Sequence, residues 1–140
     1  LAGNGAGGVE GAQTKASAED LDGRDAALAI ARAGLDKKAL NVEIIDVQGK
    51  VDYTDFVVVM SGSSDRQVVS LAKHIETEMS RRRLKCSSVE GLPNGSWVLM
   101  DFSSVVVHIF HKDTRGYYDL ESLWFEASRI EFDELGEPTG

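Results

Sequence analysis

The stretch "TDFVVVMSGSSDRQVVSLAKHI", residues 54–75, decides the fold class. Its run at 56–60 is apolar at every position, as in a strand buried on both faces of a sheet. After a turn of small residues, the apolar positions change to helical spacing, at Val68, Leu71, Ala72, Ile75 and Met79. A central strand followed by an amphipathic helix of about four turns predicts an α/β domain.

The rest of the chain adds helices and strands around this unit. We expect helices over 25–39 and 117–127, and strands over 41–47, 86–91, 95–102 and 103–111. The closing helix would place Leu120, Leu123 and Trp124 on one face. The order predicts a single compact α/β domain, with a mixed β-sheet of about five strands flanked by helices.

The composition changes at both ends of the chain. Residues 1–24 are rich in Gly, Ala and polar residues without any period, which predicts a disordered leader. This leader is too acidic for a usual transit peptide and lacks the apolar core of a signal peptide. We therefore expect a folded domain over 25–127, followed by an acidic flexible tail over 128–140 that frays.

Charge and cysteine content narrow the function classes. The net charge of −8 argues against a protein held by a nucleic-acid backbone. It suits a basic partner, such as a ribosomal protein, or serves only solubility. No apolar run approaches the ~20 residues that span a bilayer. Cys86 is the only cysteine, so no internal disulfide is possible, and we expect a reducing, cytoplasmic environment.

The turn "SGSSDRQ", residues 61–67, has two interpretations. Small residues between a strand and a helix can offer backbone N–H groups to a phosphate. Alternatively, Ser64 and Gln67 form a capping box at the start of the helix, with Asp65 favoured by the helix dipole. We favour the helix cap. Tight, Mg²⁺-dependent binding of a nucleotide would instead support the phosphate site.

A nucleotidyl transferase also needs paired carboxylates that hold two metal ions close to such a turn. After Asp65 the next acidic residue is Glu76. Acidic pairs with one intervening residue include Asp20 with Asp22 and Glu131 with Asp133, and neither of these two pairs lies on a predicted strand. The sequence therefore predicts neither catalysis nor a metal centre at this turn.

The other chemical candidates are weak. His108 and His111 fall on opposite faces of a strand, so they are poor joint metal ligands. No nucleophile elbow or Walker loop occurs, although cationic neighbours could lower the pKa of Cys86. The basic cluster at 81–85 is either a phosphate site or, as we favour, a solvated helix end. His108 is either a core histidine or a contact for a partner.

Large amphipathic side chains stand near the predicted loops. Trp97 and Tyr118 are of the type enriched at protein interfaces, whereas core packing explains Trp124.

Six segments in order resemble the ribosomal silencing factor family, also called the Iojap family. They are "DVQGK" (46–50), "TDFVVVMSGSSDRQV" (54–68), "VEG" (89–91), "GSWVLMDF" (95–102), "VVVHIFH" (105–111) and "YYDLESLW" (117–124). The resemblance covers about residues 26–126, and the shared order and spacing make it specific.

The resemblance implies a nucleotidyltransferase-like fold without catalytic carboxylates, no enzyme activity and no cofactor. It implies binding to ribosomal protein fourteen of the large subunit, at the face where the small subunit docks, and often a homodimer. Neither a membrane nor sequence-specific nucleic acid is implied. The implied partner-binding residues are Trp97, Asp101, Phe102, His108, Phe110, Tyr118 and Asp119.

Within this set, the resemblance casts Trp97 and Phe102 as apolar anchors and lets Asp101 and Asp119 meet basic residues. His108 would exchange a hydrogen bond with the partner. The sequence departs from the family at Ser103-Ser104, where many members have Gly-Asp. Two other functions stay open: a large-subunit assembly or maturation factor, and a nucleotidyltransferase with an unusual metal site.

Overall fold

A computed structural model describes residues 21–140 of the chain. Most of the expected leader, residues 1–20, lies outside the described residues. The first helix, α1 (Gly23–Asp36), begins two residues before the expected domain start, because Asp22 caps it. The carboxylate of Asp22 accepts a hydrogen bond from the backbone N–H of Asp25, at 2.7 Å.

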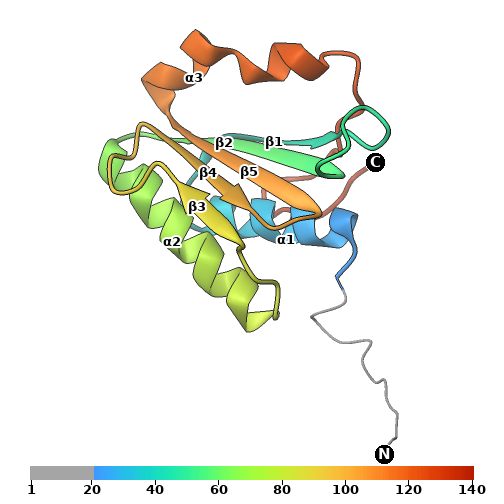
Figure 1. Cartoon of the computed structure of the whole chain (residues 1–140), viewed down its shortest axis with the longest axis horizontal. Helices are drawn as coiled ribbons and strands as arrows, with labels where there is room; N and C mark the ends of the chain where they lie inside the picture. Colours follow the sequence, from blue (N-terminus) through green and yellow to red (C-terminus); the bar gives the residue numbers. More distant parts are fainter. Residues whose placement is uncertain (1–20) are drawn as a thin grey trace, which may run out of the picture.

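Five strands form one mixed sheet, as the sequence predicts (Figure 1). They are β1 (Leu40–Asp46), β2 (Phe56–Gly62), β3 (Ser88–Glu90), β4 (Trp97–Asp101) and β5 (Val105–His111). Their spatial order is β1-β2-β5-β4-β3. The central pair, β2 and β5, is parallel, and every other neighbouring pair is antiparallel. The two strands with apolar residues on both faces therefore lie at the centre, where both faces are covered.

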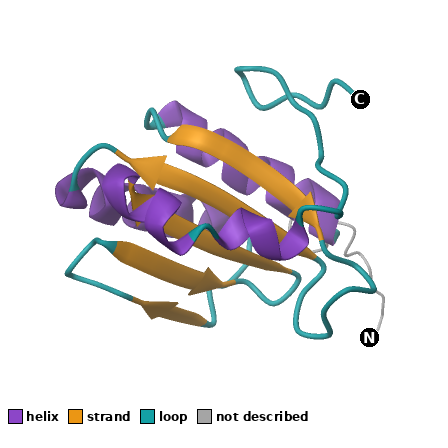
Figure 2. Ribbon diagram, turned by 90° about the horizontal axis from the view of Figure 1, so that it is seen from above, coloured by secondary structure: helices purple, strands orange, loops and turns teal. Residues whose placement is uncertain are grey.

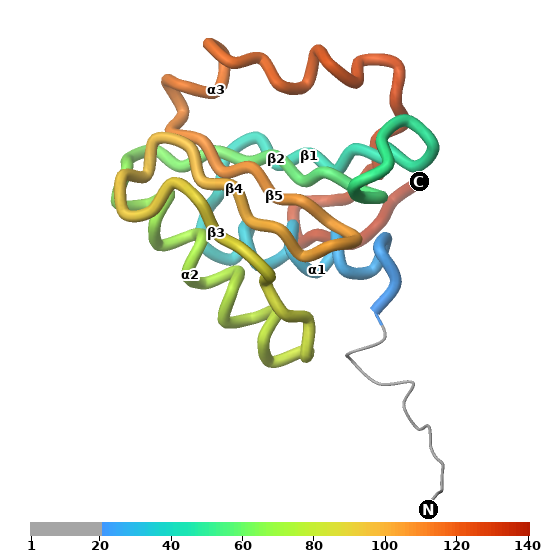
Figure 3. Tube along the Cα trace, in the orientation of Figure 1, coloured from blue at the N-terminus to red at the C-terminus, as the bar shows by residue number. Residues whose placement is uncertain are grey.

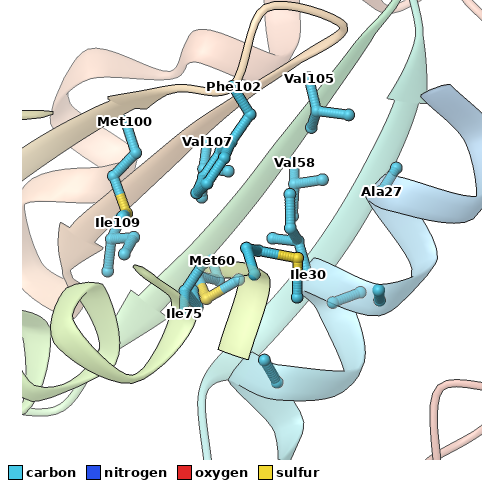
Figure 4. Packing of buried hydrophobic residues seen from close by; sticks show 14 of the residues in the cluster. Ala27, Ile30, Val58, Met60, Ile75, Met100, Phe102, Val105, Val107 and Ile109 are labelled. Carbon is cyan, nitrogen blue, oxygen red and sulfur yellow. The ribbon is translucent and has the colours of Figure 1, made fainter. Parts of the chain in front are cut away.

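Helices α1 and α2 (Asp65–Arg81) cover one face of the sheet (Figure 1). The five apolar positions that predicted α2 are all buried against the strands. The main core lies in this layer, and Figure 4 shows Met60, Phe102 and Ile109 within it.

The Gly-Ser turn before α2 is a helix cap. The hydroxyl of Ser64 accepts a hydrogen bond from the backbone N–H of Gln67, at 3.0 Å. The side-chain oxygen of Gln67 accepts from the backbone N–H of Ser63, at 2.6 Å, and its nitrogen donates to the carbonyl oxygen of Lys37, at 3.0 Å. These bonds cap the first turn of α2 and tie it to the end of α1, which confirms the capping interpretation.

The opposite face of the sheet is crossed by the segment after β5 (Figures 2 and 3). It consists of α3 (Lys112–Tyr118) and a short 3₁₀ helix, η2 (Leu120–Trp124). The expectation of one helix over 117–127 is wrong, because Asp119 has a left-handed backbone with φ of 46°. Leu120 and Trp124 still pack on the sheet, whereas the third residue of the predicted face, Leu123, is 69% exposed.

Residues 128–130 run along the edge of the sheet beside β1, and Gly136 and Glu137 contact Arg32 of α1. The backbone N–H of Asp46 donates to the carbonyl oxygen of Ser128, and that of Ile130 donates to Ile44, at 2.9 and 3.0 Å. Ile130 and Phe132 pack against the main core. The flexibility expected of this segment stays a prediction, which hydrogen exchange at these two amides would test.

Candidate functional site

Aromatic rings gather on the sheet face that α3 crosses. Trp97 begins β4, and its ring lies 5.0 Å from that of Phe110 and 4.5 Å from that of Tyr118, measured between centroids. His108 adds its ring 5.9 Å from Trp97, and Tyr117 meets Tyr118 edge-on at 5.2 Å. We call these five residues the aromatic surface.

The strand register explains why these rings meet. Trp97 pairs directly with Phe110 across β4 and β5, and His108 lies two residues before Phe110, on the same face. The left-handed residue Asp119 ends α3 just after Tyr118, whose ring lies against Trp97. The aromatic surface therefore depends on two strands and on the end of one short helix.

A hydrogen bond fixes the orientation of Trp97. Its indole Nε1 donates to Nδ1 of His108, at 3.1 Å. His108 is 8% exposed, and burial lowers its pKa to about 4 from the ordinary value of 6.5. The imidazole is therefore neutral at pH 7, as an acceptor on Nδ1 requires, and its proton sits on Nε2.

Ion pairs hold the covering segment on the sheet. The buried guanidinium of Arg115, on α3, contacts Glu121 at 2.7 Å and Glu43 of β1 at 3.5 Å. It also donates to the hydroxyl of Ser61 in β2, at 3.2 Å, and to the carbonyl oxygen of Asn41. Arg129 joins the network through Glu43, at 3.3 Å. This network fixes the position of α3, and hence of the tyrosines that follow it.

Four of the seven residues implied by the resemblance belong to the aromatic surface, and Asp119 adjoins it. Trp97 is half-buried and Tyr118 is 47% exposed, whereas Phe110 is fully buried beneath them. The exposed carboxylate of Asp119 accepts a hydrogen bond from the hydroxyl of Ser122. Phe110 thus supports the surface from below, and Trp97, Tyr118 and Asp119 present it.

The other two implied residues lie elsewhere. Asp101 ends β4, four residues along from Trp97, and accepts a hydrogen bond from the backbone N–H of Ser103, at 2.7 Å. Phe102 is 1% exposed and lies in the core beneath the opposite sheet face, near Val105 and Val107 (Figure 4). The expectation that Phe102 is an exposed anchor is therefore wrong, because the chain turns its ring toward α1 and α2.

The segment over this face also exposes apolar side chains outward. Tyr117 is 84% exposed, Leu123 is 69% exposed and Phe125 is 75% exposed. Together with Tyr118 they make the outer side of this segment apolar and aromatic, which is typical of protein interfaces.

Two groups of side chains bear on chemistry at the described residues, the candidate metal ligands and the thiol of Cys86. Within 21–140, no group of three or more His, Cys, Asp or Glu side chains is placed to hold a metal ion. The thiol of Cys86 is not activated, because burial, with help from Glu76 and Asp101, raises its pKa. None of the helices in this part of the chain is both long and apolar enough to cross a membrane.

Sequence reasoning missed Arg115, Glu43 and Glu121. Each is a single charged residue in a different element, and no periodicity or motif links them. The contacts become visible only when α3 is placed across β1 and β2.

The fold and this surface define a small mixed α/β domain that carries aromatic side chains of the kind enriched at protein interfaces. Residues 20–140 match the model of the family described as ribosomal silencing factor during starvation, and the chain belongs to that family. A ribosomal silencing factor of Bacillus subtilis is 37% identical over 98 residues, which are 70% of this chain and 83% of that protein.

Two further comparisons agree with this assignment. A mouse protein named for mitochondrial assembly of the ribosomal large subunit is 34% identical over 93 residues, covering 63% of this chain and 40% of that protein. A crystal structure from Chromobacterium violaceum has a TM-score of 0.73 at 28% identity, covering 75% of this chain and 88% of that chain.

Proposed function

We propose that this protein is a non-enzymatic translation repressor of the cytoplasm. In this proposal it binds ribosomal protein fourteen of the large subunit and blocks joining of the small subunit by steric exclusion. Membership of the ribosomal silencing factor family supports this role. The observation that carries the proposed binding mode is the aromatic surface, in which Trp97 is only half-buried although it packs against His108, Phe110 and Tyr118.

The proposed contact combines apolar and charged groups. Trp97 and Tyr118 provide the apolar centre, since large half-buried aromatic side chains dominate binding energy at protein interfaces. Asp119 and, farther along β4, Asp101 meet Lys or Arg of the basic partner. His108 acts mainly by holding Trp97, because its exposed fraction of 8% leaves little surface for the partner.

Titration of purified ribosomal protein fourteen by calorimetry tests this contact. We expect Trp97→Ala to weaken binding by more than about 30-fold, the equivalent of ~2 kcal/mol at a central interface residue. Phe102→Leu is the matched control, because it alters an aromatic residue close in sequence whose ring lies in the opposite core. Unchanged affinity for a folded Trp97→Ala variant would remove the aromatic surface from the proposal.

A second candidate function is assembly or maturation of the large subunit. The similarity to the mouse mitochondrial assembly protein favours it. This role uses the same partner, so binding alone does not distinguish the two. Subunit joining does: a maturation factor binds the large subunit without preventing assembly of the joined ribosome.

We also propose that the protein forms homodimers, as the family resemblance implies. The exposed Leu123 and Phe125 offer apolar surface for a second copy. Analytical ultracentrifugation tests this proposal. We expect a dimer, and we expect the Phe125→Ser variant to dissociate more readily. A protein that stays strictly monomeric at 100 μM, about a hundredfold above a dissociation constant of ~1 μM, would contradict the proposal.

A further inference from the structure

Although the net charge of the chain is negative, a basic groove lies on the outer side of α2. The groove has a volume of about 580 Å³, and its charged lining consists of Lys37, Arg66, Lys73, Arg81 and Glu78. Four cations thus face one carboxylate, in a chain with 15 basic and 23 acidic residues. Helix α2, which carries the groove, lies on the opposite side of the sheet from α3 (Figure 1).

The cations are spaced along the helix in one row. Arg66, Lys73 and Arg81 are separated by seven and eight residues, close to two helical turns each, so they project from the same side. At 1.5 Å per residue the row is ~22 Å long. Lys37, at the end of α1, adds a fourth charge beside it.

The local carboxylates leave most of this charge uncompensated. Glu78 pairs with Arg81, at 3.4 Å, and the Arg81 side chain is still 73% exposed. Among residues 21–140, Lys37, Arg66 and Lys73 have no carboxylate within 4.0 Å, the limit for an ion pair. The other acidic residues of α2, Asp65 and Glu76, do not line the groove.

We propose that this groove binds the phosphate backbone of RNA. A row of separate cations over ~22 Å matches a partner with repeated negative charge better than it matches a single small anion. His74 is the one ring in the groove lining, which includes no Trp, Tyr or Phe on which successive bases would stack, so the contact is chiefly with phosphates and carries no sequence preference.

This inference goes beyond the proposed function and does not depend on it. The aromatic surface and the groove lie on opposite layers of the domain, so one molecule can use both. The groove would add an electrostatic contact to any RNA near a docked protein partner.

The test uses the full chain and a fluorescently labelled single-stranded RNA of 16 nucleotides, measured by anisotropy between 50 and 200 mM KCl. For three to four neutralised phosphates, the logarithm of affinity should fall with the logarithm of salt with a slope of roughly −2 to −3. Arg66→Gln/Lys73→Gln should bind about tenfold more weakly at 150 mM and lower the slope by roughly 1.4.

The control double variant Arg24→Gln/Lys50→Gln removes the same charge from exposed positions outside the groove. It should bind RNA as the parent protein does, and so should Trp97→Ala. RNA binding that is absent at 50 mM KCl, or that falls equally in both double variants, would overturn the proposal.

A polyglutamate peptide of equal charge distinguishes RNA from an acidic protein. We expect it to bind at least tenfold more weakly than the RNA. Equal or tighter binding of the peptide would assign the groove to an acidic protein instead and overturn the RNA assignment. The binding of Trp97→Ala to ribosomal protein fourteen is measured separately. Failure of the RNA proposal therefore does not imply failure of the proposed function, and the reverse also holds.

Discussion

The indole Nε1 of Trp97 donates a hydrogen bond to Nδ1 of His108, with 3.1 Å between the nitrogens. The bond joins β4 to β5 and sets the indole plane at the proposed docking surface. It also requires an unprotonated Nδ1, so the orientation of Trp97 depends on the neutral state of a buried histidine.

We expect the two side chains to be energetically coupled. Trp97→Phe keeps an aromatic ring but leaves the His108 acceptor unpaired in a buried site, which costs about 1–3 kcal/mol of the free energy of unfolding. In the His108→Leu background the same change should cost about 1 kcal/mol less, because no acceptor remains. Urea denaturation of the four proteins measures this cycle, and additive effects would show that the bond contributes nothing.

The stability of the protein should depend on pH through His108. Its pKa is about 4 in the folded state and 6.5 in the unfolded chain, so between these values the unfolded chain binds more protons. The free energy of unfolding therefore falls as pH decreases from 6.5 to 4, by up to about 3 kcal/mol. The part of the pH dependence that disappears in His108→Gln measures this contribution, and identical profiles for both proteins would contradict it.

Removal of the Arg115 guanidinium should loosen the segment that covers the sheet. In Arg115→Met, the partly exposed Glu43 and Glu121 lose their buried partner, and we expect a loss of about 2–4 kcal/mol in the free energy of unfolding. Amide exchange in α3 and η2 should accelerate. Arg81→Met breaks an exposed pair with Glu78 and should cost less than about 1 kcal/mol. Similar losses in the two variants would show that the buried ion-pair network contributes no more to stability than an exposed pair does.

The left-handed backbone of Ser103 should have a measurable energetic cost. Ser103 has φ of 75°, in the left-handed region that glycine adopts most easily. Ser103→Gly should therefore raise the free energy of unfolding by about 0.5–1 kcal/mol. Ser104→Gly, at the next position without positive φ, should lower it by a similar amount. A destabilising Ser103→Gly would contradict this account of the turn.

Much of the fold could be predicted from local patterns. The apolar run at 56–60 and the helical spacing after Ser64 identified β2 and α2, because burial imposes a different period on each kind of element. The capping box was also predictable, since its residues lie within one helical turn.

The cover of the second sheet face could not be predicted in the same way. Leu120 and Trp124 fit a helix by spacing, but the left-handed backbone of Asp119 divides the segment. The contacts of Arg115 with Ser61 and Glu43 span more than 50 residues along the chain, so no local pattern reports them.

The candidate site was predicted in part. Residue type and resemblance identified Trp97, His108 and Tyr118, which the structure brings together. They also suggested Phe102, because residue type alone does not reveal whether an aromatic ring beside a turn faces solvent or the core. Only the strand register separates Trp97 from Phe102.

Sedimentation of purified ribosomal subunits through a sucrose gradient tests the central claim most directly. With the protein added, we predict that it travels with the large subunit and that the peak of joined ribosomes collapses, whereas Trp97→Ala leaves that peak intact. A protein that binds neither subunit, or that binds the large subunit while joining proceeds unchanged, would contradict repression by steric exclusion.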